Sequence, residues 1–540
     1  MTKERLHLFD TTLRDGQQTQ GVDFSVEDKT RIAEALDALG IDYIEGGWPG
    51  ANPTDSDFFN AAPKTRATFT AFGMTKRSGR SADNDEVLAG VMNAGTPAVC
   101  LVGKTHDFHV ETALGITLEE NLENIRASIA HIVSKGREAL FDSEHFFDGF
   151  KANPDYALAS AKAAYDAGAR WVVLCDTNGG ALPHEVRDAT QAVIAAGVPG
   201  DHIGIHTHND TEHAVANSLA AVDAGARHIQ GTLNGLGERC GNANLTTLIP
   251  TLLLKEPYAS RFVTGVTPDA LEGLTATSRM LDDILNRVPQ KQSAYVGASA
   301  FAHKAGLHAS AIVKDPTTYE HIDPAVVGNQ RVIPMSNQAG QSNLRERLRD
   351  MGLSIEKGDA RLPEILSEVK RREDVGFAYD SAQASFELWA RQVLGEKPKF
   401  FDINRYRVIV ERRRNAKGAL VSFSEAVIVA QIGNLEMMSV SDSTDELGAD
   451  SGPVNALAKA LAKDLGPYQA AIDDMRLVDF KVRITNGGTE AVTRVIIDSE
   501  DSHGTRWATV GVSANIIDAS FQALLDAVNW KLIHDGVQAA

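Results

Sequence analysis

The chain has 540 residues, which is too long for one ordinary domain and indicates two to four domains. Its composition is that of a soluble globular protein, and its net charge of −19 argues against nucleic acid or a membrane surface as a partner. We expect a cytoplasmic protein with reduced thiols, because the sequence has no apolar run that could span a bilayer, no signal-peptide core and only three scattered cysteines.

The first half of the chain alternates short apolar runs with amphipathic segments, which is the pattern of βα units around a parallel sheet. Strands are predicted at residues 6–13, 43–47, 67–72, 98–102, 139–143, 171–175, 203–206 and 229–233. Helices are predicted between them at residues 26–39, 118–133, 154–167 and 212–224. Eight such units match an α/β fold of the (β/α)8 TIM-barrel type over residues 1–285, and no Gly-x-Gly-x-x-Gly follows the first strand.

Polar side chains gather where the predicted strands end, which is the face of a barrel that carries its chemistry. The first strand runs into Arg14 and Asp15, and the second ends near Glu45. The later strands are followed by Lys104, His106, His109, Asp142, Glu144, Thr177, His206, His208 and Asn242. Because nearly every strand ends this way, we expect these residues to form one site.

Beyond the barrel the pattern becomes helical. Helices are predicted at residues 248–254, 269–285, 341–351 and 361–372. We therefore predict helical linker subdomains over 286–400 that complete the active site, with a short linker at 397–401.

A third pattern, of alternating strands with two helices, begins at residue 403 and predicts a separate α+β regulatory domain over 403–540. The strands are predicted at residues 406–411, 422–431, 478–484, 493–499 and 506–512, and the helices at 452–465 and 517–532. Residues 439–451 are rich in serine and aspartate and are expected to form an exposed loop. Residues 422–465 and 506–532 are interpreted as a weak internal pseudo-repeat.

His206 and His208 are the centre of the predicted site. Residues two apart on a strand point to the same side, so both imidazoles face one point. Together with Asp15 and Asn242 they offer two nitrogens, a carboxylate and an amide oxygen, which suit Mg, Mn or Zn with positions left open. The alternative is a hydrogen-bonded polar cluster without a metal.

Three further side chains are candidates for substrate contacts. Arg14 could pair with a substrate carboxylate or stabilise a developing enolate if it lies where the first strand turns, and otherwise forms a structural salt bridge. Glu144 could orient Arg14 or the substrate. Thr177 could offer its hydroxyl to a substrate carboxylate, although alone it is no more than a turn residue.

Three motifs, Phe9-Asp-Thr-Thr-Leu-Arg-Asp-Gly16, His206-Thr-His-Asn-Asp210 and Gly235-Leu-Gly-Glu-Arg-Cys-Gly-Asn242, together resemble the acyl-CoA Claisen condensing enzymes. These are the 2-isopropylmalate, homocitrate and citramalate synthases. Residues 507–520 are similar to the family's C-terminal amino-acid-sensing domain. Segments 43–50, 103–109 and 144–149 are most similar to the citramalate synthases, since Lys104-Thr-His106 stands where isopropylmalate synthases usually carry a Thr-Ser segment.

The resemblance implies a role for each residue. Asp15, His206, His208 and Asn242 would bind the metal, Arg14 would stabilise the enolate, Glu144 would position Arg14 and substrate, and Thr177 would bind the 2-oxo acid carboxylate. His308 and Tyr319 match the family's catalytic histidine and tyrosine, with His303 in support. These residues would come from the extension of a partner subunit, which implies a homodimer.

The resemblance also implies the reaction, in which acetyl-CoA and pyruvate condense and the thioester is hydrolysed to citramalate and CoA, with isoleucine as the feedback effector. A 2-isopropylmalate synthase, which uses 2-oxoisovalerate, is the main alternative because one methyl-scale pocket difference discriminates only modestly. A metal-dependent lyase of the same barrel and a catalytically inactive amino-acid sensor are further alternatives. The amino-acid-sensing domain argues against the lyase. The inactive sensor is disfavoured because the chain keeps the full set of candidate catalytic and metal-binding residues, namely Arg14, Asp15, Glu144, His206, His208, Asn242 and His308.

Overall fold

A computed structural model of the chain describes residues 3–334, 341–353, 355–356, 358–414, 418, 420–444, 452–463, 465–485 and 491–539. The chain divides into two compact units. One comprises Met1–Phe301 with Ile322–Gln330, and the other comprises Ala302–His321 with Arg331–Ala540. Each unit is described by itself.

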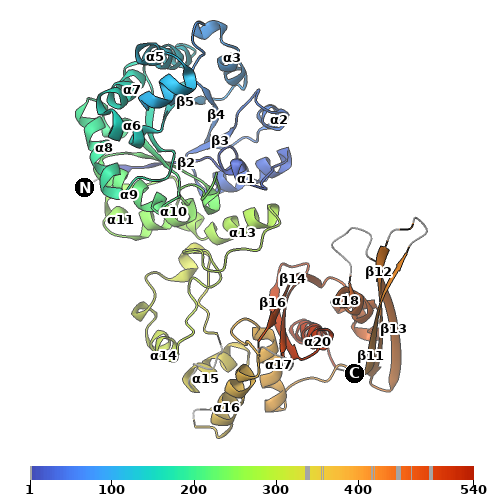
Figure 1. The fold of residues 1–540 in the computed structure, drawn as a ribbon. Helices are drawn as coiled ribbons and strands as arrows, with labels where there is room; N and C mark the ends of the chain where they lie inside the picture. The colour runs from blue at the N-terminus through green and yellow to red at the C-terminus, as the bar shows by residue number, and fades with distance from the viewer. Residues whose placement is uncertain are drawn as a thin grey trace. The chain divides into compact units, whose positions relative to one another are not determined.

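The first unit is built on a closed barrel of eight parallel strands, as predicted (Figure 1). The strands are β2 (His7–Asp10), β3 (Tyr43–Gly47), β4 (Thr68–Met74), β5 (Ala98–Lys104), β6 (Glu138–Glu144), β7 (Trp171–Asp176), β8 (Ile203–Thr207) and β9 (His228–Gly231). Pairing of β2 with β9 closes the barrel. All eight strands lie where the alternation of apolar and amphipathic segments predicts them.

The first and last barrel strands are shorter than predicted at their carboxyl ends. The predicted strand 6–13 stops at Asp10, because the Asp10 carboxylate accepts hydrogen bonds from the backbone N–H and the hydroxyl of Thr12 and turns the chain there. The predicted strand 229–233 gives way at Leu233 to a 3-10 turn in which Asn234 has a φ of 57°. Both changes free the residues that follow for the site.

Helices surround the barrel and bury its outer face. They are α1 (Val26–Leu39), α2 (Pro53–Ala61), α3 (Glu86–Asn93), α5 (Leu118–Ser134), α7 (Pro154–Asp166), α8 (Pro183–Ala195), α9 (Ala214–Ala224) and α10 (Leu245–Leu254). The first of them begins with a capping box between Ser25 and Asp28 and ends at Gly40, which is left-handed at φ 96°. A side chain on Gly40 would collide with the carbonyl of Gly265, so this helix end requires glycine.

Short helices connect the barrel to the C-terminal part. The predicted helix 269–285 is divided into α12 (Pro268–Leu271) and α13 (Leu274–Ile284). In the second unit, the helices that precede the C-terminal sheets are α14 (Gly306–Lys314), α15 (Gln341–Asp350), α16 (Arg361–Asp374) and α17 (Gln383–Leu394), of which α14 and α17 were not predicted.

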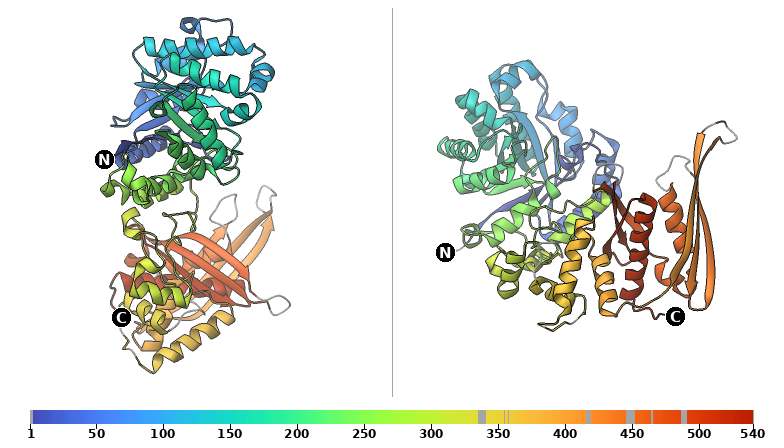
Figure 2. Two further views of the ribbon diagram at one scale, coloured as in Figure 1. Left: turned by 90° about the vertical axis from the view of Figure 1, so that its left-hand side faces the viewer. Right: turned by 60° about the horizontal axis from the view of Figure 1, so that its bottom comes forward.

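The C-terminal part contains two similar βββα arrangements. The first is β11 (Asp402–Arg414), β12 (Leu420–Ile432) and β13 (Leu435–Thr444), followed by α18 (Pro453–Lys463). The second is β14 (Arg476–Ile484), β15 (Thr493–Glu500) and β16 (Arg506–Ser513), followed by α20 (Ile516–His534). The two helices lie between the two antiparallel sheets and share one apolar core (Figure 2). The stretches predicted as a pseudo-repeat fall within these two arrangements.

Residues 439–444 belong to β13 and not to an exposed loop, which corrects the sequence prediction. Ser439 and Ser443 are buried on this strand, where they pair with Ile428 and Ser424 of β12. The low β-propensity of serine and aspartate is overridden here by strand pairing and by packing against α18. The rest of the predicted loop, 445–451, lies outside the described residues.

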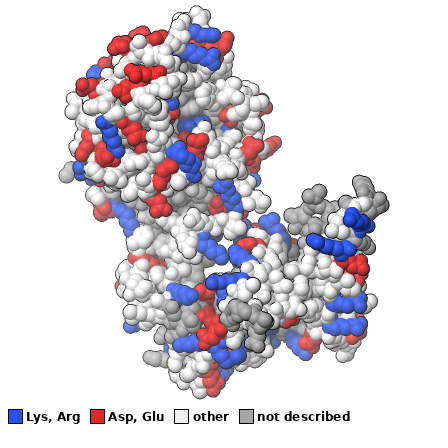
Figure 3. All heavy atoms as spheres, viewed as in Figure 1, with Lys and Arg blue, Asp and Glu red and all other residues white. Residues whose placement is uncertain are grey.

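The molecular surface carries charges of both signs. Acidic and basic side chains are interspersed over the face shown in Figure 3, so the net charge of −19 is not gathered there into one acidic patch. Among the described residues, no helix combines the length and apolar character that crossing a membrane requires.

Candidate active site

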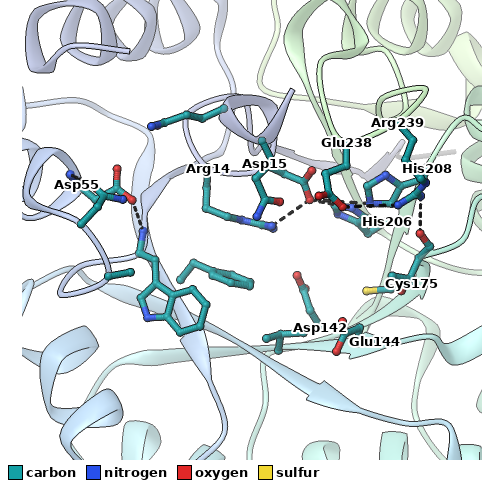
Figure 4. Close-up of a pocket in the computed structure, with 18 residues that line it drawn as sticks. Arg14, Asp15, Asp55, Asp142, Glu144, Cys175, His206, His208, Glu238 and Arg239 are labelled. Atoms are coloured by element: carbon teal, nitrogen blue, oxygen red, sulfur yellow. Dashed lines mark hydrogen bonds and ion pairs between the residues drawn. The ribbon is translucent and has the colours of Figure 1, made fainter. Parts of the chain in front are cut away.

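A pocket lies at the carboxyl ends of the barrel strands, and most of the predicted site residues line it (Figure 4). Its lining includes Arg14, Asp15, Trp48, Phe72, Val102, Asp142, Glu144, Cys175, Thr177, His206 and His208. These residues come from seven of the eight strands or the loops that follow them. One short region of the fold therefore gathers side chains that are far apart in the sequence.

Strand β8 and the residue after it place the two histidines side by side. Thr207, between them, points away and donates its hydroxyl to the carbonyl of Ala214. His206 and His208 therefore face the same side, with ring centroids 5.3 Å apart. Both are more than nine-tenths buried, so the pair is shielded from bulk water.

Asp15 and Asn242 complete a polar cluster around these histidines. The Asp15 Oδ2 atom lies 3.6 Å from His206 Nε2 and 4.0 Å from His208 Nε2. The Asn242 amide donates to Asp15 Oδ1 at 3.0 Å and to the carbonyl of Leu236. Gly237 makes room for that amide, because a side chain there would come within 2.2 Å of Asn242 Nδ2.

The donor set fits a divalent cation. Ligand atoms of Asp15, His206 and His208 all lie within 4.8 Å of one another. The Asn242 Oδ1 atom is buried and has no hydrogen-bond partner among the described residues. An unpaired buried oxygen costs free energy, and a bound cation would satisfy it. The residues present therefore suit Mg, Mn or Zn, with room for further ligands.

The protonation states in this cluster also favour a cation. Burial opposes ionisation of Asp15, but Arg14 and the two histidines outweigh it and lower its pKa to about 2. Burial, together with the nearby His206, lowers the pKa of His208 to about 4 despite the proximity of Asp15. At neutral pH the carboxylate is therefore ionised and His208 is neutral, which are the forms that bind metals.

Arg14 lies in the turn after β2, beside the cluster. Its Nε donates to Glu45 Oε2 at 2.7 Å, and its Nη1 donates to Asp15 Oδ2 at 2.9 Å. Its guanidinium carbon lies 3.9 Å from the centre of the Phe72 ring. Glu45 is completely buried and is also held by the Thr11 hydroxyl at 2.6 Å. The arginine is thus fixed on two sides at the edge of the pocket.

Glu144 contacts Lys104 and not Arg14 in this structure, and its predicted role in positioning Arg14 or the substrate stays a prediction. It forms an ion pair of 2.6 Å with Lys104, its partner in the register between β5 and β6. Strand neighbourhood explains the difference, because Glu45 is on β3, next to the strand that leads into Arg14. Glu144 still lines the pocket and remains available to a substrate.

Thr177 follows β7 and also lines the pocket. Its hydroxyl oxygen accepts the backbone N–H of His145 at 2.8 Å, and its carbonyl accepts a hydrogen bond from Arg239 at 2.7 Å. These two bonds fix the residue without using its hydroxyl proton. That proton can be donated to a ligand.

Two residues that sequence reasoning left without a role are connected to the histidine cluster, Gln230 directly and Asp142 through Gln230. Gln230 of β9 accepts a hydrogen bond from His206 Nδ1 at 2.8 Å, and its amide donates to Asp142 Oδ1 at 3.0 Å. Both side chains are buried inside the barrel. The available signal was the position of Gln230 within a predicted strand, which periodicity alone does not connect with a histidine 24 residues earlier.

His308 and Tyr319 belong to the second unit. Their rings stack with centroids 4.1 Å apart. Close by in sequence, the buried Glu320 accepts hydrogen bonds from Arg331 at 2.6 and 2.7 Å and contacts His303 Nε2 at 3.1 Å. The structure thus brings together the two residues that the resemblance singled out, and it gives His303 a carboxylate partner.

Comparison with known proteins covers nearly the whole chain. Residues 5–269 match the HMGL-like family, 295–376 the homocitrate synthase post-HMGL domain-like family, and 380–532 the LeuA allosteric (dimerisation) domain. An (R)-citramalate synthase of Aquifex aeolicus is 45% identical over 98% of both chains. One of Geobacter sulfurreducens is 46% identical over 97% of both chains. A probable 2-isopropylmalate synthase of Methanopyrus kandleri is 32% identical, over 97% of this chain and 98% of that one.

Proposed function

The chain belongs to the (R)-citramalate synthase family of HMGL-like acyltransferases, and from this premise we propose that it condenses acetyl-CoA with pyruvate to form citramalate and CoA. The observation that carries the proposal is the buried cluster of Asp15, His206 and His208 with the unpaired Asn242 oxygen. The adjacent Arg14 supplies a fixed positive charge. Such a cluster suits a reaction in which negative charge develops on a carbonyl oxygen.

A divalent ion held by Asp15, His206, His208 and Asn242 would polarise the carbonyl of the 2-oxo acid when bound. Arg14 uses Nε and Nη1 for its two ion pairs, and its Nη2 makes no hydrogen bond within the described part of the chain. That group can donate to an enolate or alkoxide oxygen. The Thr177 hydroxyl proton can be donated to the pyruvate carboxylate, which fixes the orientation of the keto acid.

His308, supported by Tyr319, is the proposed general base. It takes a proton from the methyl group of acetyl-CoA, and the resulting enolate carbon forms a bond to the keto carbon of pyruvate. The keto oxygen takes up a proton and becomes the hydroxyl group of the product. Water then cleaves the thioester, which releases citramalate and CoA. Glu144, at the pocket wall, would position the substrate.

The test is a CoA-release assay with acetyl-CoA, Mn²⁺ and a panel of 2-oxo acids. We expect the highest kcat/KM with pyruvate. A higher kcat/KM with 2-oxoisovalerate would replace the substrate assignment by that of a 2-isopropylmalate synthase. No CoA release with any 2-oxo acid would refute the condensing activity.

We further propose that the C-terminal domain makes the enzyme a homodimer that is inhibited by isoleucine, the amino acid downstream of citramalate. The match of residues 380–532 to an allosteric dimerisation domain supports this. The expected result is a mass of two chains in light scattering and a loss of turnover with isoleucine but not leucine. A monomer, or equal turnover with and without isoleucine, would refute it.

A further inference from the structure

Two hydrogen bonds link three buried side chains in series across the inside of the barrel, behind the proposed metal site. Asp142 on β6 accepts a hydrogen bond from the Gln230 amide at 3.0 Å, and Gln230 on β9 in turn accepts a hydrogen bond from His206 Nδ1 at 2.8 Å. His206 lies on β8, so the two hydrogen bonds connect three different strands. Asp142, Gln230 and His206 are 3%, 0% and 4% exposed, so water does not compete for these hydrogen bonds.

The hydrogen bonds determine which ring nitrogen of His206 faces the other ligands. A neutral imidazole carries its proton on one nitrogen and a lone pair on the other. The Gln230 atom facing the ring is its carbonyl oxygen, because the amide group is engaged with Asp142. That oxygen can only accept a hydrogen bond, so the proton is on Nδ1. The lone pair is then on Nε2, the nitrogen that lies 3.6 Å from Asp15 Oδ2.

Two electron-rich atoms face each other in this arrangement. The Nε2 lone pair of His206 and the ionised Asp15 oxygen point toward one region, with His208 Nε2 4.0 Å from the same oxygen. Like partial charges at such distances repel unless a cation lies between them. The Gln230 hydrogen bond therefore holds the histidine in an orientation that is favourable with a bound cation and unfavourable without one.

We propose that Gln230 and Asp142 are positioning residues that fix the tautomer and orientation of His206 for a divalent cation. Neither residue binds the cation. The inference rests on the proposed function, because it assumes that Asp15, His206 and His208 hold a metal. It predicts that metal affinity depends on two side chains that lie outside the ligand set, as outer hydrogen bonds to metal-binding histidines commonly do.

The test measures Mn²⁺ affinity by calorimetric titration of the full-length protein after chelation. Gln230→Met keeps the length of the side chain and removes the acceptor, and we expect a Kd about 10- to 100-fold higher. Thr70→Val is the matched control, since Thr70 is a buried polar residue of β4 outside the pocket. We expect its Kd to equal that of the wild type.

A double variant separates positioning from simple damage to the fold. Asp142→Asn with Gln230→Glu exchanges the carboxylate and the amide between the two positions. The carboxylate introduced at position 230 still accepts the Nδ1 hydrogen bond of His206, and the amide introduced at position 142 donates to that carboxylate. We expect a Kd within about threefold of the wild type.

Two outcomes would overturn the inference. One is Gln230→Met protein that binds Mn²⁺ like the wild type, and the other is an exchanged pair that binds as weakly as Gln230→Met. Wild-type protein that binds no Mn²⁺ would instead refute the metal site itself, so failure of the inference and failure of the proposed function are distinguishable.

Discussion

Lys29 is a buried cation of the barrel, and replacing it tests what holds the Arg14–Glu45 ion pair in place. Its Nζ donates to the carbonyls of Leu13 and Gly46, at 2.8 and 3.0 Å, and to Asp55 Oδ1 at 2.5 Å. Leu13 precedes Arg14 in the chain, and Gly46 follows Glu45. One ammonium group therefore joins the two segments that carry the pair.

Lys29→Met removes this cation and leaves the Asp55 carboxylate buried, with the backbone N–H of Trp48 as a remaining donor. Loss of one partner of a buried ion pair costs about 3–5 kcal/mol, because the other charge is left uncompensated. For a unit of this size that corresponds to a fall in Tm of roughly 10 °C. Lys29→Met with Asp55→Asn removes the uncompensated charge and should recover part of this loss.

The matched control is Lys162→Met. Lys162 forms an ion pair of the same length, 2.5 Å, with Asp166, but on the exposed surface of a helix. Exposed pairs contribute at most about 1 kcal/mol, so this variant should melt close to the wild type. Equal Tm losses in Lys29→Met and Lys162→Met would refute the argument that burial decides the magnitude.

The activity of the same variants tests the link to the site. Small displacements of positioned groups can lower turnover about 100-fold. We expect Lys29→Met to lower kcat/KM in the CoA-release assay by about 10- to 100-fold at a temperature where the protein is folded. Folded Lys29→Met protein with wild-type kcat/KM would show that Arg14 and Glu45 do not depend on this ammonium group.

Three further predictions concern single side chains. His206→Ala should lose Mn²⁺ binding and CoA release together, whereas the control His184→Ala, outside the pocket, should keep both, and turnover in His206→Ala would contradict the ligand assignment. Burial raises the pKa of Asp526 to about 6. The folded protein therefore binds more protons than the unfolded chain between pH 4 and 6, and this carboxylate lowers the free energy of unfolding as the pH rises through that window. Asp526→Asn should therefore be more stable than the wild type at pH 7, by roughly 2–3 kcal/mol, and nearly equal at pH 4; a difference that does not change with pH would refute this. Glu320→Gln weakens the ion pairs with Arg331 and should lower both Tm and turnover. Calorimetry and the CoA-release assay, each compared with the wild type, would test this.

The elements of the barrel could be predicted because local and tertiary preferences agree there. The predicted helix 26–39 is observed without change, since a capping box at Ser25 and a left-handed Gly40 mark both of its ends. Strand β13 could not be predicted, because Ser439 and Ser443 favour a loop locally and become a strand only by pairing with β12. Of the two unpredicted helices, α14 begins without a side-chain cap, whereas α17 ends at the left-handed Gly395, a signal that the sequence did offer. Pairing and packing partners distant in sequence decide such cases.

The same distinction applies to the candidate site, where the ligand residues could be predicted from the sequence and the hydrogen bonds that orient them could not. Alternation along one strand is enough to place His206 and His208 together, and a barrel brings Asp15 and Asn242 to the same end. The residues that orient these side chains are fixed instead by which strands are neighbours. Glu45 contacts Arg14 because β3 borders β2, and Glu144 contacts Lys104 because β6 borders β5. Gln230 reaches His206 from β9, which borders β8. A sequence therefore indicates the ligand atoms more readily than the hydrogen bonds behind them, and the Gln230→Met titration tests the part that only the three-dimensional structure reveals.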